Sequence, residues 1–216
     1  MYKTIVFDLD GTLLDTLDDL TDATNAALEK LKLKTHTKEE VRGFVGNGAV
    51  NLMERAAGEE KSVTTEELVQ AFNEYYSVHC EDKTKPYEGI LELLEKLKKQ
   101  GIHTAVLSNK PDYAVKKLAK RYFGDLLEMA LGENEAAGIR KKPAPDALFA
   151  VMKACNADKA STVFVGDSEV DIQTAKNAGV DCISVSWGFK TKKFLLENGA
   201  TKIADDALAL EKYCLS

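Results

Sequence analysis

The chain has 216 residues, 44% of them hydrophobic and 30% charged, which is enough for one large core or a core with an inserted domain. Its formal net charge of −6 predicts that the protein does not bind nucleic acid nonspecifically. No apolar run approaches the length of a membrane span and the first residues have no signal-peptide pattern, so we expect a cytoplasmic protein that does not bind membranes.

Four cysteines and three histidines give no zinc-binding pattern, because no two cysteines form a C-x-x-C pair and no histidine stands at zinc spacing from a cysteine. We therefore expect the cysteines to be reduced and structural, and the histidines to serve packing or the surface. These residues are Cys80, Cys155, Cys182, Cys214, His36, His79 and His103.

The first predicted element is a buried strand at 4–7, where the residues are β-branched or aromatic. Residues 17–84 follow as a helical block without any strand signal. Apolar residues at helical spacing predict a first helix from residue 17, and Thr37 and Glu40 stand at the spacing of a capping box. The three later helices of this block are expected at 37–44, 48–57 and 65–79.

Strands and helices alternate after residue 85. We expect helices at 89–99, 113–122, 145–155, 172–178 and 207–213, and strands at 102–107, 126–131, 162–165, 181–185 and near 202–204. This alternation predicts an α/β fold with a doubly wound, mostly parallel sheet, in which ligands bind beyond the carboxyl ends of the strands. The predicted core domain comprises 1–16 and 85–216, and 17–84 is a helical insert.

Two carboxylates follow the first strand, since Asp8 and Asp10 stand two residues apart and Gly11 lets the chain turn away. Side chains at this spacing on an extended segment point the same way, so we expect them to converge past the end of the strand. Close carboxylates repel each other unless a proton or a metal lies between them. The pair therefore predicts a functional site, although Asp and Gly are also ordinary turn residues.

Three further polar motifs lie downstream. They are Ser108-Asn109-Lys110, Lys142-Pro143-Ala144-Pro145-Asp146 and Gly166-Asp167-Ser168-Glu169-Val170-Asp171. Together with the first motif they resemble the signature set of the haloacid dehalogenase-like hydrolase superfamily, in its phosphatase branch, over nearly the whole chain. The resemblance implies that the insert is a four-helix cap domain.

The resemblance also implies hydrolysis of a phosphate monoester through an aspartyl-phosphate on Asp8, with Asp10 as general acid and then general base. It implies a Mg²⁺ ion held by the Asp8 carboxylate, the Asp10 backbone carbonyl and Asp167. Asp171 would orient metal-bound water or Lys142 from outside the ligand set.

Three residues are predicted to bind the phosphoryl group. Ser108 and Asn109 would hold its oxygens at the start of a helix, and Lys142 would offset its charge. The alternatives are helix capping for the first two and a solvated basic run for the lysine. Residues 187–189 are expected to be a loop and packing feature.

The segment 42–56 is similar to the cap segment of phosphoglycolate phosphatases. Gly46, Asn47 and Gly48 would leave backbone N–H groups available to an anion, so we predict that they bind the substrate, with 2-phosphoglycolate as the first choice. A simple helix–turn–helix would use the same residues and has equal weight.

Several alternatives stay open within the superfamily, namely pyrophosphatases, nucleotidases, sugar-phosphate phosphatases and β-phosphoglucomutases. The mutases carry a hinge histidine where this chain has Leu20 and a cap arginine near Ala49, which lowers that alternative. Asp10 argues against a true dehalogenase, and Asp10 with the long insert argues against a phospho-receiver module; a non-catalytic binding protein is a further alternative. We expect a small phosphorylated metabolite as the partner and a monomer or dimer.

Overall fold

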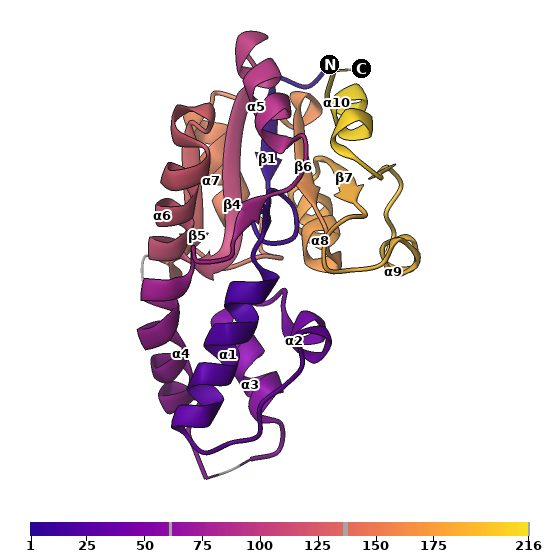
Figure 1. The fold of residues 1–216 in the computed structure, drawn as a ribbon. Helices are drawn as coiled ribbons and strands as arrows, with labels where there is room; N and C mark the ends of the chain where they lie inside the picture. The colour runs from indigo at the N-terminus through magenta and orange to yellow at the C-terminus, as the bar shows by residue number, and fades with distance from the viewer. Residues whose placement is uncertain (61, 136–137, 216) are drawn as a thin grey trace. The chain divides into compact units, whose positions relative to one another are not determined.

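The computed structural model describes residues 1–60, 62–135 and 138–215 (Figure 1). The chain forms two compact units. The first unit combines Met1–Leu14 with Pro86–Ser216, and the second is the continuous segment Asp15–Lys85. The short strands β2 (Leu14–Asp15) and β3 (Lys85–Pro86), which the sequence did not predict, pair where the chain passes from one unit to the other.

The first unit is built on a six-stranded sheet with the order β5-β4-β1-β6-β7-β8, in which all the described pairings are parallel. Its strands are β1 (Thr4–Phe7), β4 (His103–Pro111), β5 (Met129–Glu133), β6 (Thr162–Gly166), β7 (Asp181–Val185) and β8 (Ile203–Ala204). The chain leaves β1 for β4 and β5 on one side and returns to β6, β7 and β8 on the other. The predicted doubly wound, mostly parallel sheet is therefore confirmed.

Helices cover both faces of this sheet, and Figure 1 shows α5 in front of it and α7 behind it. The helices are α5 (Ile90–Lys99), α6 (Asp112–Tyr122), α7 (Asp146–Ala154), α8 (Glu169–Ala178), α9 (Lys192–Glu197) and α10 (Ala207–Leu215), with the 3-10 turns η1 (Gly124–Leu126) and η3 (Lys159–Ser161). The sequence did not predict α9, a short helix whose first turn is capped by the Thr191 hydroxyl, which accepts a hydrogen bond from Phe194 N–H.

The apolar core behind the sheet explains why β1 is central. Val6 pairs in register with Ala105 of β4 and Phe164 of β6, and all three are fully buried. They pack against Leu148 and Val151 of α7 in one hydrophobic cluster. Strands buried on both faces consist of continuous apolar runs, which is the pattern that made them predictable.

One predicted boundary was wrong in a way that affects the site. The sequence placed Ser108-Asn109-Lys110 after a strand ending at residue 107, at the start of a helix. In the structure β4 continues to Pro111, with a shift in its pairing to β5 after Leu107. The motif therefore lies in the last residues of a strand, and α6 begins only at Asp112.

The second unit contains α1 (Leu17–Lys30), α2 (Lys38–Phe44), α3 (Gly48–Ala57) and α4 (Thr65–His79), and the predicted insert of four helices is confirmed. Its helix starts follow from local chemistry. Thr37 and Glu40 form the predicted capping box of α2, and Thr64 and Glu67 form another at α4.

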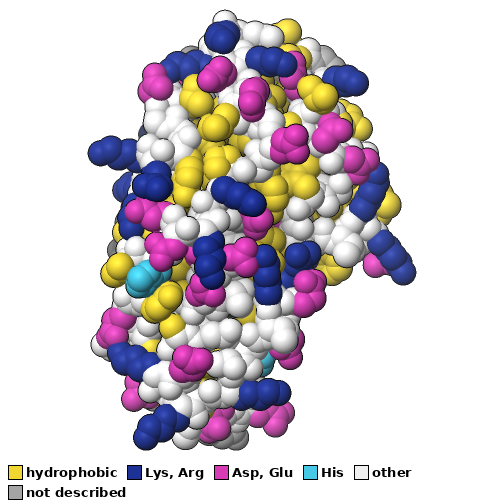
Figure 2. Space-filling view, viewed as in Figure 1, with side chains coloured by type: hydrophobic (Ala, Val, Ile, Leu, Met, Phe, Trp, Pro, Cys, Tyr) yellow, Lys and Arg dark blue, Asp and Glu magenta, His cyan; other side chains and the backbone are white. Residues whose placement is uncertain are grey.

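The described residues contain no helix with the length and the apolar composition needed to cross a membrane. Figure 2 shows Lys and Arg side chains interspersed with Asp and Glu on the face in view, rather than a continuous patch of one sign.

A buried carboxylate ties the two ends of the second unit together. Asp19, which is 1% exposed, accepts hydrogen bonds from the backbone N–H groups of Lys83 and Thr84. The Thr84 hydroxyl donates to the same carboxylate at 2.7 Å. The start of α1 is thereby fixed to the last residues before the chain leaves the unit.

Replacing Asp19 by Ala is expected to lower the free energy of unfolding by about 2–4 kcal/mol, because two backbone donors and a hydroxyl lose their buried acceptor. Urea denaturation followed by circular dichroism measures this change. Asp22→Ala is the matched control, since Asp22 lies on the same helix and its ion pair with the Lys83 side chain is exposed. That control should cost less than about 1 kcal/mol; equal losses in the two variants would contradict the role of Asp19.

Candidate active site

The polar motifs meet at the point where the sheet reverses its strand order. Asp8 follows β1, Asn109 and Lys110 end β4, and Asp167 follows β6. These strands are neighbours, so their carboxyl ends present the motifs side by side. In open α/β sheets this crevice is where ligands bind. The structure therefore brings together the first, second and fourth motifs of the sequence.

Lys142, from the third motif, lies among the acidic residues and is 3% exposed. Its Nζ donates to Asp171 Oδ1 at 2.7 Å and lies 2.9 Å from Asp8 Oδ1. Lys142 is thus a buried ammonium between two carboxylates. This excludes the alternative interpretation, in which Lys142 belongs to a solvated basic run. Burial alone would lower the pKa of Lys142, but the negative charges of Asp171 and Asp8 raise it above its usual value.

Three buried carboxylates lie close together at this lysine, because Asp8 and Asp171 contact Lys142 and Asp167 offers an oxygen within 4.8 Å of both. Burial raises the pKa of Asp8 to about 6, against the opposing effect of Lys142 and with further increases from Asp171 and Asp10. Burial, followed by the charges of Asp171 and Asp8, also raises the pKa of Asp167 well above its usual value. The site carries more negative charge than Lys142 balances.

The donor set fits a magnesium ion, because Mg²⁺ prefers oxygen ligands and is held by few carboxylates. Asp171 already uses both oxygens, one toward Lys142 and the other toward the backbone N–H and hydroxyl of Ser168. Asp8 and Asp167 are therefore the carboxylates best suited to bind the metal, while Asp171 positions Lys142 and caps α8. The metal-binding roles predicted for Asp8 and Asp167, and the positioning role predicted for Asp171, stay predictions.

Glycines allow the backbone to approach the Asp167 carboxylate closely. A Cβ added to Gly11, whose φ is +78°, would lie 2.4 Å from Asp167 Oδ2. A Cβ on Gly188 would lie 2.3 Å from Asp167 Cβ. Phe189 N–H donates to Asp167 Oδ2 at 2.6 Å, so the loop at 187–189 holds a site carboxylate as well as packing. Sequence reasoning missed this role, because the loop and Asp167 belong to different motifs.

Asn109 acts on the backbone of Lys142. Its side-chain carbonyl accepts from Lys142 N–H at 2.8 Å, and its amide donates to the Lys142 carbonyl at 3.0 Å. This double hydrogen bond fixes the main chain that carries the buried ammonium. Ser108 is buried nearby in the same strand, and its hydroxyl lies 3.4 Å from the backbone nitrogen of Lys110. Phosphate binding by Ser108 and Asn109 stays a prediction.

Lys110 is the site residue to which the sequence analysis gave no role. Its Nζ lies 2.9 Å from Asp10 Oδ1 and 3.1 Å from Asp10 Oδ2, and its side chain is 2% exposed. The residue was visible as the third member of the Ser-Asn-Lys motif. Its partner was not, because 100 residues separate Lys110 from Asp10 in the chain.

Gly46, Asn47 and Gly48 lie in the second unit, where they connect α2 to α3. Gly46 has a φ of +133° and Gly48 a φ of +83°, so both adopt backbone conformations that favour glycine. The Asn47 side chain makes no capping hydrogen bond to α3. Their part in substrate binding stays a prediction.

Comparison with known proteins matches residues 5–185 to the family model described as haloacid dehalogenase-like hydrolase. A phosphoglycolate phosphatase of Pseudomonas syringae pv. tomato is 35% identical over 99% of this chain and 80% of its own. One of Psychrobacter arcticus is 34% identical over 98% of this chain and 95% of its own.

Among solved structures, a proposed phosphoglycolate phosphatase from Lactobacillus delbrueckii subsp. bulgaricus is similar to the chain with a TM-score of 0.92. It is 38% identical, and the match covers 99% of this chain and 98% of that one. The resemblance inferred from the four motifs is thus confirmed. The chain belongs to the haloacid dehalogenase-like hydrolase family and is a phosphatase of its phosphoglycolate phosphatase-like branch.

Proposed function

We propose that the protein is a Mg²⁺-dependent phosphatase that hydrolyses 2-phosphoglycolate through an aspartyl-phosphate on Asp8. The observation that supports the mechanism best is the buried contact of Lys142 with Asp8, beside the carboxylate of Asp167. The support for the substrate is the name that the relatives share, together with the resemblance, noted from the sequence, of the segment 42–56 to the cap segment of phosphoglycolate phosphatases.

In the first step an Asp8 carboxylate oxygen forms a bond to phosphorus while the bond from phosphorus to the alkoxide oxygen breaks. Asp10 gives its proton to that departing oxygen. In the second step Asp10 takes a proton from water, whose oxygen bonds to phosphorus as the bond to Asp8 breaks. Phosphate leaves, and the Asp8 carboxylate and the protonated Asp10 are restored.

The positive charges of the site have distinct parts in this scheme. Lys142 lies next to Asp8 and would offset the negative charge of the transferring phosphoryl group. Mg²⁺ bound by Asp8 and Asp167, with the Asp10 backbone carbonyl, would supply further charge neutralisation when present. Lys110 contacts both oxygens of Asp10 and would fix the direction in which that carboxyl group delivers its proton.

The second unit would act as the cap of this enzyme. We place the core domain at 1–16 and 85–216 and the cap at 17–84, with the turn at Gly46, Asn47 and Gly48 offering backbone N–H groups to the carboxylate of the substrate. A cap excludes water during phosphoryl transfer and selects the substrate. We propose a cytoplasmic location and a monomer or dimer.

The direct test measures phosphate release from 2-phosphoglycolate, pyrophosphate, nucleoside monophosphates and sugar phosphates with Mg²⁺. We expect 2-phosphoglycolate to give the highest kcat/KM and Asp8→Asn to lose about 1,000-fold or more, because the nucleophile is removed. Asp125→Asn, which changes an exposed carboxylate paired with Lys98, is the matched control and should keep full activity.

The panel separates the two parts of this proposal. Broad, weak activity that still requires Asp8 would support the mechanism and reject the substrate. Another phosphate ester as the leading substrate would support the corresponding alternative phosphatase. Phosphate release that is unchanged by Asp8→Asn would contradict the mechanism itself.

The crowding of carboxylates predicts that Asp167→Asn makes the metal-free protein more stable at pH 7. The folded-state pKa of Asp167 is raised, so its ionisation costs folding free energy above the unfolded pKa of about 3.9. The gain in unfolding temperature should be at least about 2 °C at pH 7 and should shrink as the pH falls toward the unfolded pKa of about 3.9, below which the group is protonated in both states.

The same variant should lose the stabilisation that Mg²⁺ gives to the wild type, since a ligand that binds only the folded state raises the unfolding temperature. Differential scanning fluorimetry with and without Mg²⁺ measures both effects. Asp205→Asn, an exposed carboxylate paired with Lys192, is the control and should respond to Mg²⁺ as the wild type does. A variant that is less stable without metal and equally stabilised by Mg²⁺ would refute the metal role of Asp167.

Lys110→Met is expected to lower kcat about 10- to 100-fold with little change in KM, because it removes the contact that directs the general acid/base. Lys110→Arg keeps a positive donor and should recover part of the loss. Steady-state kinetics on the best substrate of the panel separates the two parameters. A rise in KM at constant kcat would instead assign Lys110 to substrate binding.

A further inference from the structure

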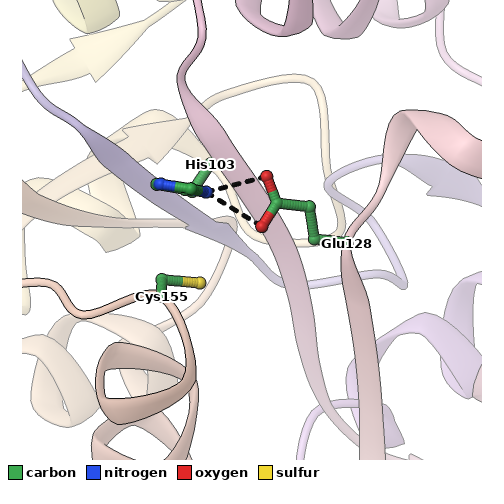
Figure 3. Close-up of side chains that lie close together, drawn as sticks. All are labelled: His103, Glu128 and Cys155. Carbon is green, nitrogen blue, oxygen red and sulfur yellow. Dashed lines mark hydrogen bonds and ion pairs between the residues drawn. The ribbon is translucent and has the colours of Figure 1, made fainter.

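A second group of metal-ligating side chains lies in the first unit, apart from the motifs of the active site. It consists of His103 at the start of β4, Glu128 just before β5 and Cys155 just after α7. Figure 3 shows these three side chains, from three separate segments of the chain, gathered at one place. The sequence analysis gave no metal role to His103 or Cys155, because 52 positions separate them in the chain.

The ligand atoms are close enough to share one ion. His103 Nδ1 lies 2.8 Å from Glu128 Oε1 and 2.9 Å from Oε2. The Cys155 sulfur lies within 4.8 Å of the ligand atoms of both partners. Zinc is bound tetrahedrally at about 2.0–2.3 Å from nitrogen, oxygen and sulfur, so neighbouring ligand atoms in such a site are about 3.3–3.8 Å apart. Small side-chain rotations would bring the three atoms to that spacing.

The chemistry of the set selects the metal. Imidazole, thiolate and carboxylate together suit Zn²⁺, whereas Mg²⁺ prefers oxygen ligands alone. The set thus differs in kind from the carboxylates of the active site. The alternative to a metal site is a simple ion pair between His103 and Glu128, which does not require a sulfur atom. The presence of Cys155 makes the group a candidate site for a thiophilic ion.

The group is also far from the chemistry of the enzyme. His103 begins β4, and Lys110 lies seven residues further along the same strand. At about 3.3 Å per residue, roughly 20 Å of strand separates the two. An ion at His103 therefore lies at the amino end of the sheet, away from the edge that carries Asp8 and Asp167.

We propose that His103, Glu128 and Cys155 form a zinc-binding site, with His103 Nδ1, a Glu128 oxygen and Cys155 Sγ as ligands and water in the fourth position. On binding, the thiol releases its proton to solvent and the neutral imidazole carries its proton on Nε2. The ion links the start of β4, the segment before β5 and the end of α7. Its role is to stabilise this end of the sheet, and it takes no part in hydrolysis.

Cobalt(II) is the spectroscopic probe for this site, because a thiolate ligand gives a charge-transfer band in the near ultraviolet that all-oxygen sites lack. The titration uses the full chain with excess Mg²⁺, which occupies the carboxylate site. We expect one equivalent of Co²⁺ to produce the band, and one equivalent of Zn²⁺ to abolish it. Zn²⁺ should also raise the unfolding temperature of the wild type.

The variants decide which residues are ligands. Cys155→Ser should lose the band, and His103→Gln and Glu128→Gln should each weaken the affinity for Co²⁺ about tenfold or more. Cys182→Ala is the matched control, because Cys182 is another half-buried cysteine and should leave the band and the affinity unchanged. All four variants should keep the phosphatase activity of the wild type.

Three outcomes would overturn the proposal. They are a Co²⁺ spectrum without the thiolate band, a band that persists in Cys155→Ser, and an affinity that His103→Gln leaves unchanged. Because these readouts do not depend on hydrolysis, the zinc site can fail while the proposed phosphatase activity stands, and the reverse is also true.

Discussion

The structure of the active site depends on one constraint, the crowding of negative charge around the buried ammonium of Lys142. Lys142 contacts Asp8 and Asp171, and Asp167 lies beside them. Lysine can neutralise only one charge, and burial makes the remaining ionised carboxylates costly. A divalent cation would remove this cost, which supports the proposed binding of Mg²⁺ and, next to it, of a phosphoryl group.

The fold supplies the positions that this constraint requires. The carboxyl ends of β4, β1 and β6 lie side by side at the reversal of strand order, and each delivers one motif. Gly11 and Gly188 let two loops approach Asp167 more closely than any side chain would permit. Asn109 holds the backbone of Lys142 from both sides. The lysine is therefore placed by main-chain contacts, while its charge acts on Asp8.

Local sequence patterns predicted most of the fold, including the exact limits of α3 and α4, because capping boxes and helical periodicity act over a few residues. They misplaced Ser108-Asn109-Lys110 at the start of a helix, because three polar residues after an apolar run indicate the end of a strand although β4 continues through them. The strand pattern predicted from the sequence brought the motifs of Asp8 and Asp167 to one edge of the sheet, where the structure has them, whereas the position of Lys142 beside Asp8 did not follow from that pattern. Contacts between residues far apart in the chain, such as Lys110 with Asp10, could not be predicted from local patterns. The sequence does not show which residues of neighbouring segments face each other.

The two proposed metal sites would let one sheet separate two kinds of chemistry. At the carboxyl ends the strands present buried carboxylates and loops with glycine, which would suit a hard cation and a substrate next to it. At the amino end His103 and Glu128 stand where chain segments enter the sheet, and the thiol of Cys155 comes from the end of a helix that covers it. The oxygen ligands would then bind Mg²⁺ and the nitrogen and sulfur ligands a thiophilic ion. The two sites lie at opposite ends of β4, so binding of one ion would not disturb the other.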